Sequence, residues 1–457
     1  MANIVIYSDG TGQRGGLLFD ERRSNIYKLY RATRCGPDSS VNPANQVTFY
    51  DPGLGTVSVG HTLGLAGALT RSFRNLVSQA TGLGITHNII DCYAAIIRLW
   101  RPGDRMFLLG FSRGAYTVRC LSAVISMCGV PTRDKDGQPL RRDQKTVEGI
   151  ASEAVKNVYQ YTESVTPKGA TNRQKKLLAQ RADRARNFRE RYASGNATDA
   201  NKANAYPYFI GVFDSVASIA KPIMTASLIV VSTSLLAAPS WILLRWFGFN
   251  IGFWIWFGAF ALALVVLAAL IVFESTIWWW PFHIRKLHME LEETSLSNEV
   301  EVARHALAID EHRRSFKQVP WGGSYTEAKG DTGWFEQRWF AGNHSDIGGS
   351  YPENESRLSD ISLRWMVEEA AKAGLKIDSS VLHLYPDATG SQHDETRKGF
   401  FRLAPKWLRP IDSGAILDSS VFERLKAVEI LNYDKMQPYR PKNLRNHGKA
   451  KEFFDGG

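Results

Sequence analysis

A serine flanked by two glycines, set between an apolar run and a helical pattern, constrains this chain more than any other feature. Residues 105–109 form a short apolar run that is typical of a buried strand, and Gly110-Phe111-Ser112-Arg113-Gly114 follows at once. A helical pattern then runs from Ala115 to about Met127. Two glycines permit a tight turn from strand to helix, which lifts a serine hydroxyl above the sheet. The sequence therefore predicts that Ser112 is a nucleophile rather than only a helix cap.

Strand and helix patterns alternate along most of the chain. Strands are predicted at 3–7, 47–50, 105–109, 208–213 and 335–340, and helices at 85–100, 115–127, 172–192, 290–312 and 358–373. The helix at 290–312 contains His305 and His312, which are interpreted as packing or surface residues. This alternation predicts the α/β class, with a mostly parallel sheet covered by helices on both faces.

A serine nucleophile needs a base, and the base needs a carboxylate that orients it. His344 is the candidate base because it follows a predicted strand and enters a glycine-rich loop. Asp214 follows another predicted strand and lies between Ser112 and His344, which is the chain order of α/β-hydrolase triads. Two other acids compete with it. Asp310 lies in a predicted helix, and Asp346 lies two residues after His344, where it is also suited to bracing the loop.

Backbone N–H groups near the predicted nucleophile are candidates for an oxyanion hole. Arg113 begins the helix after the serine, so its N–H is expected to face the developing charge. The loop after the first strand, which contains Gly10 and Thr11, is expected to supply a second donor. Asp9 either orients this loop or forms an ordinary Asx turn, and the sequence favours neither.

Charge and cysteine content indicate which partners and which redox compartment suit this protein. The formal net charge is +11, but there is no long basic tail and no nucleic-acid-binding motif, so the sequence predicts no nucleic-acid partner. Anionic membrane surfaces are the favoured partner instead. The four cysteines form no CxxC pair, which is typical of free thiols in a reducing compartment.

Two uncharged apolar segments follow the predicted acid. They run over about 223–244 and 252–273, each roughly long enough to cross a bilayer as a helix, with aromatic residues at both ends. The sequence therefore predicts a two-span transmembrane hairpin at 221–286, which binds the bilayer through 223–273. The hydrolase core is predicted in two parts, 1–220 and 287–457, facing the cytoplasm. A polar, basic segment at 132–205 within the first part is interpreted as a solvated insertion or as a lid.

Several short motifs together resemble one family. They are Asp9-Gly10-Thr11, Pro52-Gly53-Leu54-Gly55-Thr56, Gly103-Asp104, Gly110 to Tyr116, Gly211 to Val216, His305 to Glu311 and His344 to Glu353. The chain resembles the α/β-hydrolase domains, formerly of unknown function, that include phospholipase effectors of bacterial type VI secretion. The resemblance spans most of the chain and implies a nucleophile at Ser112, a base at His344 and an acid at Asp214. The hydrophobic hairpin and the polar segment before it depart from the family pattern.

The leading hypothesis is a membrane-associated serine esterase or lipase that hydrolyses phospholipid acyl esters and needs no metal or organic cofactor. Its substrate partner would be membrane lipid. One alternative is a membrane scaffold that keeps the fold without turnover. Another is an antibacterial phospholipase toxin delivered to a target cell, for which an immunity protein and a secretion system are the expected partners.

Overall fold

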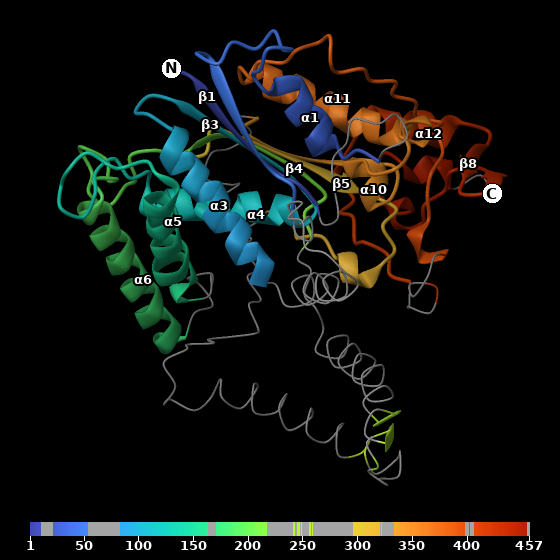
Figure 1. Cartoon of the computed structure of the whole chain (residues 1–457). Coiled ribbons are helices and arrows are strands. Elements are labelled where there is room, and N and C mark those ends of the chain that lie inside the picture. The colour runs from blue at the N-terminus through green and yellow to red at the C-terminus, as the bar shows by residue number, and fades with distance from the viewer. Residues whose placement is uncertain are drawn as a thin grey trace. The chain divides into compact units, whose positions relative to one another are not determined.

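The computed structural model describes most of the chain in separate ranges. These are residues 1–10, 22–53, 83–162, 171–216, 296–319, 321, 333–397, 402 and 406–454, with seven positions between 241 and 258. The chain divides into two compact units, one of 1–63, 84–218 and 291–457, and one of 64–83 and 219–290. The sheet and the candidate site lie in the first unit (Figure 1).

A parallel sheet forms the centre of the first unit. Seven strands in the described part of the chain pair in the order β2-β1-β3-β4-β5-β6-β7, and every pairing is parallel. Their bounds are β1 Asn3–Ser8, β2 Gln46–Asp51, β3 Arg105–Phe111, β4 Pro207–Phe213, β5 Val302–Ala308, β6 Phe335–Phe340 and β7 Ile416–Leu417. The predicted mostly parallel α/β fold is confirmed.

The direction of the strand order reverses at β1. The chain passes from β1 to β2 on one side and then returns to β3 on the other side. Ligands of open parallel sheets bind at such a reversal, outside the carboxyl ends of the strands. Ser8 at the end of β1 pairs in register with Gly110, and Phe111 at the end of β3 pairs with Phe213. The residues that follow these strands therefore share one edge of the sheet.

Helices cover both faces of this sheet. The longer ones are α1 Asn25–Thr33, α3 Leu83–Leu99, α4 Arg113–Cys128, α5 Gln144–Glu153, α6 Asn172–Arg191 and α11 Arg357–Lys372, and the shorter ones are α10 His344–Gly348 and α12 Ser419–Lys426. Figure 1 shows α1 and α11 on one face and α3 and α4 on the other. Tyr7, Phe107 and Phe209 project toward the first face and pack with Leu29 of α1 and Met366 of α11. Strands that are buried on both faces read as continuous apolar runs, which is the pattern of 105–109.

Several smaller elements complete the described part of the first unit. An antiparallel pair is formed by β8 Ile430–Asn432 and β9 Lys435–Gln437. A π-helical turn at Ala154–Val158 continues α5, and single 3-10 turns lie at Tyr159–Tyr161, Arg314–Phe316, Glu353–Glu355, Glu395–Arg397, Lys442–Leu444 and Lys451–Phe453.

The predicted helix at 290–312 is wrong over residues 296–312, the part of it that the structure describes. Residues 302–308 form β5, an inner strand of the sheet, in which His305 is fully buried. The apolar residues of Val-Ala-Arg-His-Ala-Leu-Ala occur at spacings that fit a helix as well as a strand covered on both faces, so periodicity alone does not separate the two. His305 is held by the N–H of Ser215 at 3.3 Å and by the side chain of Gln337 at 3.2 Å. It is thus a packing residue in a strand.

The polar segment at 132–205 contains α5 and α6. A capping box of Thr171 and Gln174 begins α6, as expected for an exposed helix. Its C-terminal turn is anchored where Arg189 donates to the carbonyl of Met127 at 2.5 Å. Met127 lies at the opposite end of α4 from Ser112, so this anchor is remote from the serine. A lid role for 132–205 stays a prediction.

The predicted two-span membrane protein is corrected by the structure. No helix in the described part of the chain is long and apolar enough to cross a bilayer. The apolar runs 223–244 and 252–273 lie almost wholly outside the described residues, and so does most of the predicted hairpin 221–286. A bilayer span needs one unbroken apolar helix of about 20 residues, and the described residues contain none. The assignment of the hydrolase domain to the cytoplasmic side, which depended on the spans, falls with it.

Candidate active site

Ser112 occupies a strained turn between β3 and α4. Its backbone has φ +58° and ψ −120°, a left-handed conformation that is uncommon for a residue with a side chain. The flanking glycines are required by space. A Cβ at Gly110 would meet the carbonyl oxygen of Gly114 at 2.5 Å, and a Cβ at Gly114 would collide with the backbone carbonyl of Ser8. The glycines thus let the chain turn sharply, with Ser112 at its tip.

The loop after β1 lies beside this turn. A Cβ at Gly10 would meet the Cβ of Ser112 at 3.3 Å, so the two backbones are close. Asp9 is buried and accepts the N–H of Gly10 at 2.7 Å, the hydroxyl of Ser24 at 2.5 Å and the hydroxyl of Tyr50 at 2.8 Å. These contacts favour the interpretation of Asp9 as a residue that orients the loop. Thr11 lies outside the described residues.

Asp9 has an elevated proton affinity. Burial raises its pKa from 3.8 to about 7, against the opposing effect of the hydrogen bonds from Ser24, Tyr50 and Gly10. Asp51 at the end of β2 adds to the effect by charge repulsion, and its own pKa is raised by burial to about 6. The two carboxyls make this end of β1 and β2 sensitive to pH.

His344 begins the short helix α10. Asn343 fixes the start of α10 by accepting the N–H groups of Ser345 at 2.8 Å and Asp346 at 3.0 Å. The imidazole is buried and stacks on the ring of Phe111, the residue before the serine, with centroids 4.7 Å apart. Its Nε2 has no hydrogen-bond partner in the described residues. Burial lowers the pKa of His344, although hydrogen bonding to Asp214 opposes the effect.

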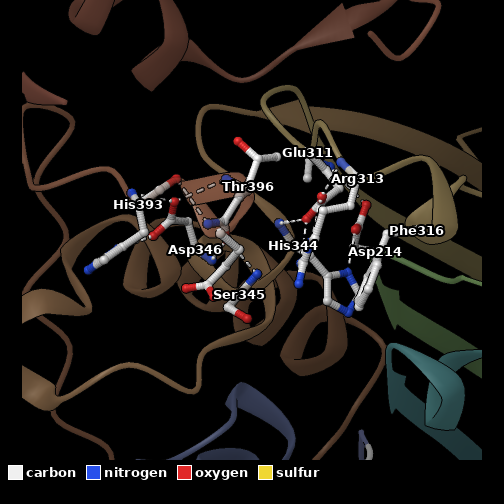
Figure 2. Close-up of polar contacts among 12 residues, drawn as sticks. Asp214, Glu311, Arg313, Phe316, His344, Ser345, Asp346, His393 and Thr396 are labelled. Carbon is white, nitrogen blue, oxygen red and sulfur yellow. Dashed lines mark hydrogen bonds and ion pairs between the residues drawn. The ribbon is translucent and has the colours of Figure 1, made fainter. Parts of the chain in front are cut away.

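Asp214 directly follows β4 and contacts the ring of His344. Its Oδ2 lies 2.5 Å from His344 Nδ1, and its Oδ1 accepts the N–H of Ala308 at 3.0 Å (Figure 2). Asp214 is fully buried, with a positive φ of +40°. Burial raises its pKa, but the charge of Arg409 and the bond to His344 outweigh this and hold the pKa below its ordinary value. The carboxylate therefore stays ionised beside the imidazole of His344.

The two competing acids serve other contacts. Asp310 accepts the N–H of Gly342 and the hydroxyl of Tyr439, each at 2.8 Å. Asp346 accepts the N–H of Asn343 at 3.0 Å and bonds to the ring of His393 at 2.7 Å. Figure 2 shows Asp346 and His393 on the far side of His344 from Asp214. Both acids hold the loops around α10 and neither bonds to the imidazole of His344.

Sequence reasoning missed two charged groups beside the site. Arg409 is fully buried and forms a two-point ion pair with Asp214. Glu311 accepts the backbone N–H of His344 at 3.3 Å and forms a two-point ion pair with Arg313. Glu311 lies in a recognised motif and was thus open to prediction, whereas no local pattern marks Arg409. In the described residues, no group of histidine, cysteine, aspartate and glutamate side chains is arranged to hold a metal ion.

Comparison with known families gives a decisive match. The family model described as the T6SS phospholipase effector Tle1-like catalytic domain matches residues 2–369. The chain belongs to this family. The match includes Ser112, Asp214 and His344, so these three residues of the Tle1-like chain lie within the catalytic domain of the family. Arg409 lies beyond it.

The alignments with individual relatives cover only part of this Tle1-like chain and only part of each relative. An uncharacterised protein of Saccharomyces cerevisiae is 31% identical over 129 residues, which are 28% of this chain and 18% of the yeast protein. The crystal structure of an uncharacterised protein from Pseudomonas aeruginosa has 16% identity and a TM-score of 0.36, over 84% of this chain and 48% of that one. The structure of the Tle1 effector bound to the VgrG spike of the type VI secretion system has 12% identity and a TM-score of 0.32, over 84% and 76%. The chain thus spans less than half the length of the yeast and Pseudomonas relatives.

Proposed function

We propose that this chain is a serine hydrolase that cleaves acyl esters of phospholipids. Ser112 is the nucleophile, His344 the general base and Asp214 the acid that orients the base. One observation carries the proposal: the ring of His344 bonds to Asp214 through Nδ1 at 2.5 Å and stacks on Phe111, directly before Ser112, while its Nε2 has no partner in the described residues. Membership of a phospholipase family supports hydrolysis as the reaction class.

The reaction has two halves. Nε2 of His344 takes the proton of the Ser112 hydroxyl as Oγ attacks the ester carbonyl, and the imidazolium then gives that proton to the departing alcohol oxygen. Water next attacks the acyl-enzyme, gives a proton to His344, and releases the fatty acid as Ser112 regains its proton. The lowered pKa of His344 keeps the ring neutral near pH 7, as a base requires.

Backbone N–H groups would stabilise the oxyanion. The N–H of Arg113 is at the first position of α4, where no carbonyl of the helix accepts it, and the helix dipole favours negative charge there. Gly10 and Thr11 remain the proposed source of a second donor. The N–H of Gly10 must exchange its bond to Asp9 for the oxyanion if it contributes.

The substrate and partners follow from the family. Its description is that of a type VI secretion phospholipase effector, so we propose membrane phospholipid as substrate, delivery to a target cell, and secretion-system and immunity proteins as partners. The net charge of +11 favours encounter with anionic headgroups.

Two assays on the purified protein test the hydrolase. A fluorophosphonate probe should label the wild type, and vesicles of phosphatidylethanolamine and phosphatidylglycerol should release fatty acid. Ser112→Ala should lose the label, and its rate should fall by about three or more powers of ten. Ser126→Ala is the matched control, because Ser126 lies in the same helix and its hydroxyl has no hydrogen-bond partner in the described residues. An unlabelled wild type without fatty-acid release would favour a silent scaffold and overturn the proposal.

A further inference from the structure

We propose that Arg409 is a positioning residue for catalysis, which holds the carboxylate of Asp214 in the one orientation that serves His344. The inference rests on the proposed triad and extends it to a residue outside the matched family domain of 2–369. Arg409 touches neither substrate nor nucleophile in this proposal, and it acts through Asp214.

The hydrogen bonds around Asp214 fix the plane of its carboxylate. Oδ1 accepts from Arg409 Nη1 at 2.5 Å and from the N–H of Ala308 at 3.0 Å. Oδ2 accepts from Arg409 Nη2 at 2.9 Å and bonds to His344 Nδ1 at 2.5 Å. Each oxygen thus has two partners, one of them from the guanidinium. A two-point pair of this kind sets both distance and rotation, which a single bond does not.

Arg409 is itself held by the last residue of β5 and by the 3-10 turn Arg314–Phe316. Its Nη1 donates to the carbonyl of Ala308 at 3.1 Å, and its Nη2 donates to the carbonyl of Phe316 at 2.8 Å. The guanidinium is fully buried and therefore has no water to exchange with. Nη1 and Nη2 of Arg409 each bond to one carboxylate oxygen and one backbone carbonyl, so the guanidinium has little freedom to rotate. A fixed guanidinium in turn fixes the carboxylate of Asp214.

Backbone contacts keep the segment in place independently of the side chain. Lys406 forms an isolated antiparallel bridge with Arg313, and the N–H of Trp407 donates to the carbonyl of His312 at 2.9 Å. The side-chain amide of Asn443 donates to the carbonyl of Arg409 at 3.4 Å and to the carbonyl of Ile309 at 2.9 Å, which links the segment to the residue after β5. A change of Arg409 alone should therefore leave this segment attached, which makes the role of the side chain testable.

Arg409 also contributes charge. Its charge is the largest influence that opposes the effect of burial and lowers the pKa of Asp214. Among the described residues, Glu311 and Arg313 also act on the pKa of His344, and the charge of Asp214 acts on the neighbouring His305. Removal of a positive charge raises the proton affinity of the pair as a whole, whichever member takes the proton. The pair must be unprotonated to act as a base. A variant without the charge of Arg409 should therefore begin to lose activity at a higher pH than the wild type.

The test compares Arg409→Gln and Arg409→Lys with Arg424→Gln. Arg424 is the matched control because it is also fully buried and bonds to carbonyl groups, at 2.6 Å from Ala388 and 2.9 Å from Gly390, without contacting the pair. Arg409→Gln should lower kcat on a short water-soluble ester at least about 100-fold, with KM little changed, and should move the acidic limb upward by about one pH unit. In Arg409→Lys, the low-pH limb of the activity profile should return to its wild-type position, because the positive charge is kept. Its kcat should recover only in part, because an ammonium lacks the two-point geometry. Arg424→Gln should lower the melting temperature without moving the limb.

A second readout does not depend on turnover. The proton affinity of His344 can be followed by nitrogen-15 NMR of labelled histidines, with His344→Ala used to assign the signal. The midpoint should rise in Arg409→Gln and stay unchanged in Arg424→Gln. An inactive wild type with this shift would refute the hydrolase but keep the Arg409–Asp214 coupling. Unchanged kcat and an unchanged midpoint in folded Arg409→Gln would overturn the positioning role.

Discussion

The carboxylate of Asp9 accepts the N–H of its own neighbour Gly10 at 2.7 Å, in the loop whose backbone approaches Ser112. The bond fixes the backbone of this loop at the edge of the sheet where the oxyanion hole is predicted. It also occupies a donor that catalysis would use. We therefore expect the protonation state of Asp9 to affect the stability of the protein and, through the proposed oxyanion hole, its activity.

Asp9→Asn should reduce the dependence of stability on pH. Burial raises the pKa of Asp9 from 3.8 to about 7, so between these values the folded protein binds more protons than the unfolded chain, and stability falls as pH rises. A shift of about three units corresponds to at most about 4 kcal/mol. Urea unfolding of both proteins at pH 4.5 and 7.5 checks this. Equal pH slopes for the variant and the wild type would refute the linkage.

Ser112→Gly should abolish hydrolysis and stabilise the fold by about 1 kcal/mol. Glycine adopts the φ of +58° without the strain that serine carries. Ser112→Ala should lose activity equally but gain no stability, because alanine keeps the Cβ. Thermal unfolding separates the two variants, and equal melting temperatures would show that the turn stores no strain.

Glu311→Gln should shift the acidic limb of kcat/KM to lower pH. The negative charge of Glu311 raises the pKa of His344, and its removal also leaves the charge of Arg313 unopposed. Glu355→Gln is the control, because Glu355 bonds to His393 rather than to His344. A limb that moves upward, or that moves equally in both variants, would contradict this account of the electrostatics.

Gly114→Ala should be strongly destabilising and inactive. Its new Cβ would collide with the backbone carbonyl of Ser8, and neither partner is a flexible side chain. Gly149→Ala in α5 should instead stabilise by about 0.5 to 1 kcal/mol, because nothing lies within 4 Å of its Cβ position. Chemical unfolding of the two variants measures both changes in the free energy of unfolding. A well-folded, active Gly114→Ala would mean that the start of α4 and the end of β1 are farther apart than described.

Ser112→Ala and His344→Ala should each remove nearly all activity, and the double variant should be no slower than either single variant. Members of one triad act as a unit, so their effects do not add. Initial rates on a soluble ester test this. Multiplicative losses in the double variant would show that the two residues act independently.

Local patterns were sufficient to predict the strand, turn and helix around Ser112, because each depends on residues that are near in sequence. They were not sufficient for β5, since a strand covered on both faces has no alternating pattern to distinguish it from a helix. The choice of Asp214 as the candidate acid came from its position after a strand and from chain order. Its contact with His344 spans 130 residues and required three-dimensional coordinates to observe.

Arg409 could not be predicted for a related reason. An arginine has the same local signature whether it lies in solvent or is fully buried against a carboxylate. Its partner is 195 residues away, and the segment around it carries no motif. Only the folded chain distinguishes it from the many other basic residues of this protein.

The distance in sequence between Asp214 and Arg409 has a consequence for how activity arises. A chain that had grown only to residue 369 would contain the serine, the acid and the histidine, with a buried carboxylate still lacking its cation. Contacts between residues so far apart form slowly, because a long loop must close before they are made. Full catalytic competence should therefore appear only after the residues beyond 369 have packed against the rest of the unit, and a ribosome-bound or clipped chain should do far less damage to the membranes of the cell that makes it.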